Sequence, residues 1–306
     1  MVKYILKRLG ISLITIWVLA TVVFILVRLM PGDPFVSEKL TPEIRANLER
    51  YYGFDKPLIV QYFTYMKNIA QGDFGHSIKY VNQSVNKIIA DAFPYSFDLG
   101  MRALSFSIAL GLVFGIIAAL NRGRTLDFIC IIIAIIGTSV PDFIIGALLQ
   151  YFFGIKWGLF PVAQYMGIEY TILPSIALGF YTLAMVSRLM RASMLEVVQQ
   201  DYIKTAKSKG ISRLRIIYKH QIRNSILPVV TVLGPTVAAV LTGTFVIESI
   251  FAIPGMGKYY VQSVQNADYS LILGMTIFYG IFLVIANMIV DILYGLIDPR
   301  IRVSGR

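Results

Sequence analysis

The sequence predicts an all-α membrane protein with six transmembrane helices and both termini in the cytoplasm. Hydrophobic residues make up 57% of the 306 residues and charged residues only 15%, which lies well outside the composition of soluble domains. A helix needs about 20 consecutive apolar residues to cross a bilayer. Six such runs occur, at about residues 9–30, 99–120, 128–153, 171–190, 226–250 and 271–297. We expect them to form a single transmembrane domain, residues 1–306.

The first apolar run is predicted to be a retained membrane anchor. It follows Lys3, Lys7 and Arg8, is too long for the core of a signal peptide, and lacks a small-residue cleavage site. The N-terminus should therefore stay inside.

The basic residues follow the topology that six spans would give. With the N-terminus inside, the inner segments hold 17 of the 28 lysines and arginines, whereas the long outer segment at about 31–96 holds seven basic and seven acidic residues. This asymmetry is typical of membrane proteins, whose cytoplasmic loops are enriched in lysine and arginine. The excess of positive charge is thus explained by topology, and we expect no nucleic-acid partner.

The outer segment is predicted to be folded, with two helices. Thr41 can cap the first, which would begin at Pro42 and stop near Gly53. The second should follow Pro57 and end near Gly72. The segment is either a lid over the outer ends of the spans or a docking surface for something delivered from outside.

Two acidic residues in or near the membrane are candidate pathway or gate residues. Asp142 lies beside Pro141 near the middle of the third run, where a charge costs at least about 3 kcal/mol. It should line a wet pathway, or else form an ion pair or a protonated hydrogen bond. Glu248, at the outer end of the fifth run, is predicted to be a gate or a loop anchor.

The second run contains two pairs that predict helix contacts. Gly111 and Gly115 form a GxxxG step, which favours close approach of another helix. Asp98 and Arg102, four residues apart, should pair on one helix face.

The longest inner connection, at about 191–225, is predicted to be helix, glycine, helix. Asp201 to Lys209 suits a short helix that Gly210 ends. Ile203 and Ala206 can face inward while Lys204, Lys207 and Ser208 stay in water. The small residues Thr205 and Ala206 would let another protein approach closely; the alternative is an interfacial helix whose lysines bind anionic lipid headgroups.

The residues that carry most enzyme chemistry are sparse or badly placed. Cys130 is the single cysteine, His76 and His220 fall on opposite sides of the predicted bilayer, and no GxxxxGK[ST] phosphate-binding loop occurs. We therefore expect no enzyme activity, no metal site and no cofactor in this chain.

Several motifs resemble one family of transport proteins. "DYIKTAKSKG", residues 201–210, followed by "HQIRNSILP" is similar to the cytoplasmic coupling loop of binding-protein-dependent ABC importers in their peptide and nickel branch. The general pattern there is Glu-Ala-Ala, three residues, Gly; here Lys204-Thr205-Ala206 precedes Gly210. "RLMPGDPF", "SVPDFIIG", "VIESIFAIPGMG" and "DPRIR" also resemble this branch. "EKLTPEIRANL" and "SIKYVNQSVN" look most like the first membrane subunit of oligopeptide importers.

The resemblance implies a type I ABC importer permease fold with a cytoplasmic coupling helix. It implies a second, similar permease subunit, two ATPase subunits that bind ATP and magnesium, an extracytoplasmic peptide-binding protein, and a bacterial or archaeal cell membrane. The residues expected to couple to an ATPase are Asp201, Lys204, Thr205, Ala206 and Gly210. Import of dipeptides, nickel or glutathione stays an alternative, and an ion-coupled secondary carrier is the alternative from another class.

Overall fold

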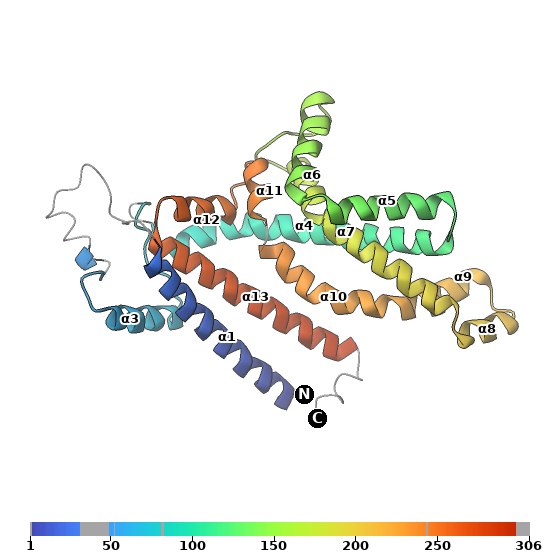
Figure 1. The fold of residues 1–306 in the computed structure, drawn as a ribbon, viewed down its shortest axis with the longest axis horizontal. Coiled ribbons are helices and arrows are strands. Elements are labelled where there is room, and N and C mark those ends of the chain that lie inside the picture. Colours follow the sequence, from blue (N-terminus) through green and yellow to red (C-terminus); the bar gives the residue numbers. More distant parts are fainter. Residues whose placement is uncertain (1, 31–48, 52, 81–82, 243, 298–306) are drawn as a thin grey trace. The chain divides into compact units, whose positions relative to one another are not determined.

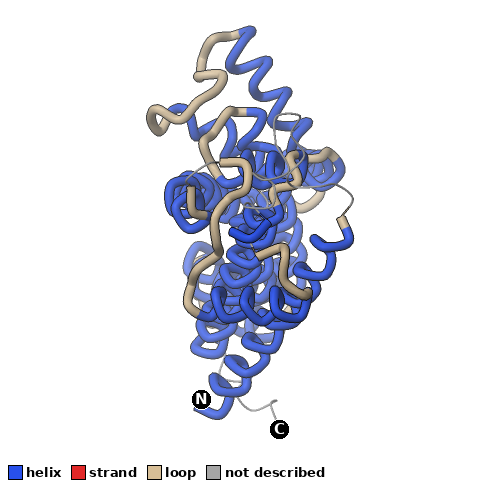
Figure 2. Tube along the Cα trace, turned by 90° about the vertical axis from the view of Figure 1, so that its left-hand side faces the viewer, coloured by secondary structure: helices blue, strands red, loops and turns tan. Residues whose placement is uncertain are grey.

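The computed structural model describes residues 2–30, 49–51, 53–80, 83–242 and 244–297, and its side chains from residue 6 to residue 289 of these ranges. Most described residues are helical, and loops connect the helices (Figures 1 and 2). In this part of the chain the only β-type pairing is an isolated bridge between His76 and Ser84. The prediction of an all-α protein is confirmed.

Five helical stretches are long and apolar enough to cross a bilayer, and a bent pair of helices makes a sixth if it counts as one span. The predicted number of six spans is therefore confirmed when the bent pair is counted as one span. The five stretches are Leu6–Leu29, Val85–Leu120, Glu169–Val198, Arg213–Ile250 and Tyr269–Ile289. They correspond to helices α1 (Val2–Leu29), α4 (Val85–Leu120), α7 (Glu169–Val198), α10 (Arg223–Thr242) with its neighbours, and α13 (Tyr269–Ile297).

The third predicted span is not one continuous helix, and that expectation was wrong. It consists of α5 (Thr125–Ser139), then α6 (Asp142–Leu149) and the π-helix η1 (Gln150–Lys156), bent by 111°. Pro141 lacks the N–H that would continue the helix, and its ring excludes helical backbone at the residue before it. Val140 is accordingly extended, with φ −97° and ψ 125°.

The chain divides into two compact units. The first comprises Met1–Pro94 and Gly255–Ile289. Its core joins Val23, Phe24 and Val27 of α1 to apolar residues at the start of α13, and the two helices run side by side in Figure 1. Helix α3 (Leu58–Ala70) confirms the helix predicted after Pro57. The other predicted outer helix, at 41–53, lies mostly outside the described residues, and its described part at 49–51 is helical.

Asp268 fixes the start of α13 within this unit. Its buried carboxylate accepts hydrogen bonds from the hydroxyl of Ser77 and from the backbone N–H groups of Ile78, Lys79 and Leu271, the last three at 3.1 Å. Three of these donors belong to the loop before α4, so one side chain both caps α13 and anchors that loop. α12 (Met256–Gln265) precedes this cap.

The second unit comprises Tyr95–Pro254 and Val290–Arg306 and is organised around α7. A Cβ atom at Gly111 would lie 2.9 Å from the Leu183 carbonyl oxygen, and one at Gly115 would lie 2.7 Å from the Ser187 carbonyl oxygen. Helices α4 and α7 are therefore in backbone contact, which confirms the predicted GxxxG packing. The remaining elements are α8 (Asp201–Ser208), α9 (Arg213–Ile216), η2 (Ile217–Ile222) and α11 (Phe245–Ile250).

Candidate functional site

Helix α8 has one buried and one exposed side, as predicted. Ile203 and Ala206 are buried in a cluster with Ile216 of α9, and Val197 and Ile211 pack against it. The two buried positions are three residues apart, so they share one face of the helix. Helix α7 continues to Val198 and α10 begins at Arg223, so both ends of the predicted connection at 191–225 are helical.

The exposed side of α8 carries short polar groups and charges. The Lys204 ammonium lies 2.8 Å from the Asp201 carboxylate, and both side chains are well exposed. The Thr205 hydroxyl donates to the Asp201 carbonyl at 3.0 Å. Of the two small residues expected to meet another protein, only Thr205 lies on this side; the side chain of Ala206 points into the cluster and holds the helix in place.

Gly210 ends α8 in a Schellman motif. Its N–H donates to the Lys207 carbonyl at 3.0 Å, and the Ile211 N–H donates to the Ala206 carbonyl at 3.3 Å. The motif requires a left-handed residue, and Gly210 has φ +72°. Ile211 also packs against the cluster that contains Ala206, which is the apolar contact typical of this motif.

Replacing Gly210 by valine should favour local unfolding of the C-terminal end of α8. A Cβ atom there would meet nothing within 4 Å, so the cost comes from the backbone alone, about 1–2 kcal/mol for a left-handed residue. We expect trypsin to cut after Lys204 and Lys207 about 5–30 times faster, because cleavage follows the opening equilibrium. Gly210→Asn is the control, since asparagine tolerates this conformation. Equal rates in both variants would show that the turn does not hold α8.

The sequence reasoning missed an ion pair at the base of α7. Asp127, buried in the first turn of α5, receives the Arg191 Nε at 2.6 Å and the Arg191 Nη2 at 2.8 Å, together with the Gly123 N–H at 2.9 Å. This bidentate pair ties the α4–α5 turn to α7, ten residues before α8 begins. The partners are 64 residues apart, so no local spacing could have revealed them.

Pro141 and Asp142 lie at the bend between α5 and α6. Asp142 is the first residue of α6 and is half-buried, and its carboxylate accepts the Phe143 N–H at 2.8 Å. Asp142 therefore lies at a break between two helices and not in the middle of a straight span. A role in the pathway stays a prediction.

Glu248 is buried in α11 and organises the turn that follows. Its carboxylate accepts the Thr244 hydroxyl at 2.5 Å, and its backbone carbonyl accepts the Ile253 N–H at 2.8 Å. These contacts are those of a loop anchor, one of the two predicted roles; its role as a gate stays a prediction.

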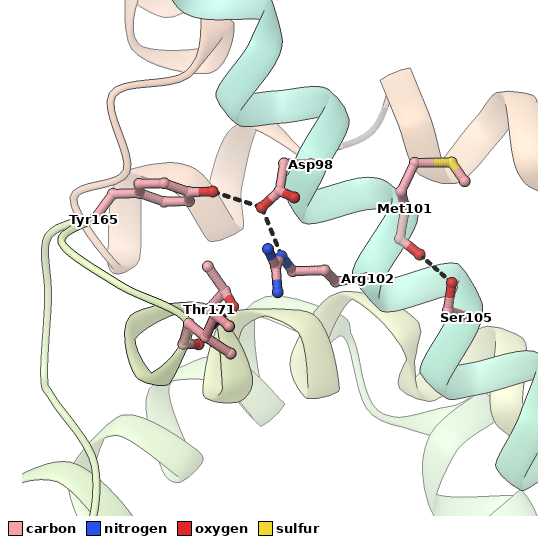
Figure 3. A network of polar contacts seen from close by, with 7 residues as sticks. Asp98, Met101, Arg102, Ser105, Tyr165 and Thr171 are labelled. Atoms are coloured by element: carbon pink, nitrogen blue, oxygen red, sulfur yellow. Dashed lines mark hydrogen bonds and ion pairs between the residues drawn. The ribbon is translucent and has the colours of Figure 1, made fainter.

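The predicted pair of Asp98 and Arg102 is confirmed and has a third member. Figure 3 shows the Asp98 carboxylate between the Arg102 guanidinium and the Tyr165 hydroxyl, at 2.6 and 2.5 Å. Burial first, and then the hydrogen bond to Asp98, raise the pKa of Tyr165 to about 12, so its hydroxyl stays a neutral donor. The contact fixes the loop before α7 against α4.

No group of three or more metal-ligating side chains occurs among the described residues. His76 and His220 belong to different units. The arrangement of the second unit is that of a helical membrane scaffold with a polar helix exposed beside it.

Two family profiles match the chain. The profile of the family described as binding-protein-dependent transport system inner membrane component matches residues 111–303. A second profile, described as the N-terminal part of the membrane component of binding-protein-dependent transport systems, matches residues 1–100.

Several relatives are similar over the whole length. The chain is 48% identical to the dipeptide transport system permease protein DppB of Bacillus subtilis, covering 100% of both chains. It is 46% identical to the oligopeptide transport system permease protein OppB of Haemophilus influenzae, covering 99% of this chain and 100% of the relative. The OppB of Escherichia coli is 40% identical with the same coverage.

A solved structure shares the fold. The crystal structure of an amino acid ABC transporter with histidines aligns with a TM-score of 0.52, over 70% of this chain and 94% of that one. Sequence identity is 16%, so this likeness concerns the fold alone.

Proposed function

Because the chain belongs to the binding-protein-dependent transport system inner membrane component family, we propose that it is the membrane-spanning permease subunit of an ATP-driven importer of oligopeptides. Members of this family are transport subunits of the membrane and not enzymes. The relatives named for oligopeptide and for dipeptide transport match over essentially the whole chain, at 46% and 48% identity. Import of dipeptides is therefore the alternative within the same function.

The observation that carries the coupling role is the two-sided packing of α8. Its inner side is buried through Ile203 and Ala206, while Asp201, Lys204 and Thr205 present a polar, charged surface to solvent. Such a helix is held rigidly yet is open to a protein partner. We assign Asp201, Lys204 and Thr205 to contact with a partner ATPase, and Ala206 and Gly210 to keeping the helix in place.

ATP and magnesium would be bound by two partner ATPase subunits in the cytoplasm, where both termini of this chain would also lie. Closure of the ATPases would push α8, and the Asp127–Arg191 pair would keep the base of α7 moving with the α4–α5 turn. The ATPases thereby bias the permease between outward-open and inward-open states. The peptide would arrive from an extracytoplasmic binding protein and pass between this chain and a second, similar permease subunit, with Pro141, Asp142 and Glu248 near the pathway.

A cysteine at position 205 should crosslink to an ATPase subunit. Starting from Cys130→Ser, which removes the one native cysteine, Thr205→Cys is introduced and native membranes are treated with a short bifunctional reagent. The expected product has the mass of this chain plus one ATPase, and its yield changes on addition of ATP. Mass spectrometry of the adduct identifies the partner.

The matched control is Thr125→Cys in the same background. Thr125 is exposed at the start of α5, on the loop predicted to share the cytoplasmic side. It should give little ATPase adduct. If position 205 labels only lipid or a second copy of this chain while the protein remains abundant, the interfacial-helix reading and the ion-coupled carrier would be favoured instead.

A further inference from the structure

Helix α3, in the segment between the first two spans, exposes its most apolar side chains. Leu58, Ile59 and Phe63 are 61–63% exposed. None of the 13 residues of α3, all of which the structure describes, is fully buried. A helix that lies against a protein in water turns such residues to the core, and an exposed apolar face marks an interaction surface.

The polar side chains of α3 lie on the opposite side of the helix. Gln61, Thr64 and Asn68 are three and four residues apart, so they share one face, and all three line a cavity of the first unit. Ile59 and Phe63, four residues apart, share the other face. The polarity of α3 is therefore inverted, with polar groups towards the protein and apolar groups outward.

The contacts of α3 place it well before the C-terminal end of α1, beside which it lies. The Tyr62 hydroxyl is 2.8 Å from that of Thr21, and the ring centroids of Tyr62 and Tyr65 are 5.5 and 5.6 Å from that of Phe24. Thr21 and Phe24 precede Leu29, the last residue of α1, by eight and five residues. At 1.5 Å per residue these positions lie about 12 and 8 Å from the helix end.

The uncharged part of α1 has the length of the hydrocarbon core of a bilayer. Arg8 and Arg28 enclose 19 residues without a charge. This stretch rises about 28 Å, and the hydrocarbon core is about 30 Å thick. Thr21 lies seven residues before Arg28, about 10 Å along the helix. Tyr62, which contacts Thr21, therefore lies at the depth of the acyl chains.

The surface of α1 beside this contact is itself apolar and exposed. Trp17 and Ile25, about one turn on either side of Thr21, are 58% and 51% exposed. The exposed face of α3 thus continues the exposed face of a candidate span. The Thr21 hydroxyl donates to the Trp17 carbonyl at 2.8 Å, so the Tyr62 hydroxyl is the donor in their contact. Both hydroxyls are paired, as surroundings of hydrocarbon require.

The single charge of α3 fits a position at the edge of a bilayer. Lys67 is the only charged residue of the helix, lies in its last turn and is exposed. The long apolar stem of lysine lets its ammonium reach the headgroups while the helix stays in the apolar layer. A soluble partner protein would have to enter the acyl layer to cover Phe63, so lipid is the occupant that fits.

We propose that α3 is an interfacial helix that inserts Leu58, Ile59 and Phe63 among the acyl chains of the leaflet at the C-terminal end of α1. In the predicted topology this is the outer leaflet. A helix of this kind lies in the plane of the interface with its apolar face buried about 5–10 Å. The proposal goes beyond the proposed function, because its partner is lipid and it holds whichever solute is carried.

The test is power saturation in electron paramagnetic resonance, with a nitroxide on the full-length chain in liposomes of phosphatidylcholine and phosphatidylglycerol. In the Cys130→Ser background, the label is attached to Phe63→Cys or to Ile14→Cys. Ile14 is 62% exposed within the uncharged part of α1 and gives the value for lipid. Oxygen is concentrated in hydrocarbon and nickel-EDDA in water. The ratio of oxygen to nickel collision rates at position 63 should therefore approach that at position 14.

Thr64→Cys is the matched control, because Thr64 is the next residue, is also exposed and faces the cavity. Its ratio should be several-fold lower than that at position 63. If Phe63→Cys does not fold, Ile59→Cys repeats the measurement one turn earlier. Equal, low ratios at positions 63 and 64 would place α3 in water and overturn the proposal. An immobilised label at position 63 that neither reagent reaches would also overturn it, because a second protein chain would then cover this face.

Discussion

Replacing Asp127 by asparagine should lower the free energy of unfolding by about 3 kcal/mol. Asp127 is almost fully buried and receives two N–H groups of Arg191, whose side chain is 26% exposed. Removing one partner of a buried pair leaves the other charge without compensation, which costs about 3–5 kcal/mol when both are buried. We take the lower value because Arg191 retains some access to solvent. The measurement is unfolding of the purified chain by sodium dodecyl sulfate, followed by circular dichroism.

Asp201→Asn is the control for this prediction. It also replaces a carboxylate by an amide, here in the pair with Lys204. The Lys204 side chain is 70% exposed and the Asp201 side chain is 95% exposed. Exposed pairs contribute about 0–1 kcal/mol, so this variant should unfold nearly as the wild type does. Adding Arg191→Met to Asp127→Asn should recover part of the loss, because the uncompensated charge is gone. Equal losses in the two single variants would contradict the structural role of the buried pair.

Replacing Gly115 by alanine should also destabilise the protein, by about 2 kcal/mol. The new Cβ atom would lie 2.6 Å from the Met190 Cβ and 2.7 Å from the Ser187 carbonyl oxygen, so α4 and α7 would have to separate. Overpacking of this kind costs about 1–3 kcal/mol, and in lipid there is no hydrophobic gain to offset the lost contact. The same unfolding measurement applies.

Gly10→Ala provides the opposite case. Gly10 lies within α1, and a Cβ atom there would meet nothing within 4 Å. Alanine is the better helix former by about 1 kcal/mol, so this variant should be as stable as the wild type or more so. If Gly115→Ala were equally harmless, the close approach of α4 and α7 would not be a source of stability.

The sequence alone determined the features that depend on neighbouring residues. The apolar runs predicted the spans because length and hydropathy decide whether a helix can cross a bilayer. The alternation of Ile203 and Ala206 with charged residues predicted the buried side of α8, and Gly210 predicted its end. The pair of Asp98 and Arg102 followed from four-residue spacing on one helix.

Features that join distant segments could not be predicted in this way. Pro141 was visible in the sequence, but proline is tolerated in transmembrane helices, so its presence did not distinguish a continuous span from one bent by 111°. Tyr165 reaches Asp98 across 67 residues, and Arg191 reaches Asp127 across 64. Neither pair has a spacing that marks it.

A cavity of about 310 Å³ in the first unit, lined by Arg28, Gln61 and Tyr65 among others, belongs to the same class. Arg28 comes from the end of α1, and Gln61 and Tyr65 come from α3. Nothing in the sequence distinguishes them from other residues at the end of a span or on a surface helix. What the sequence determined is therefore the set of helices and their polar faces, because periodicity acts within a few residues. Only the tertiary structure decided which charges meet and which polar atoms are left without partners, because that depends on which helices pack together.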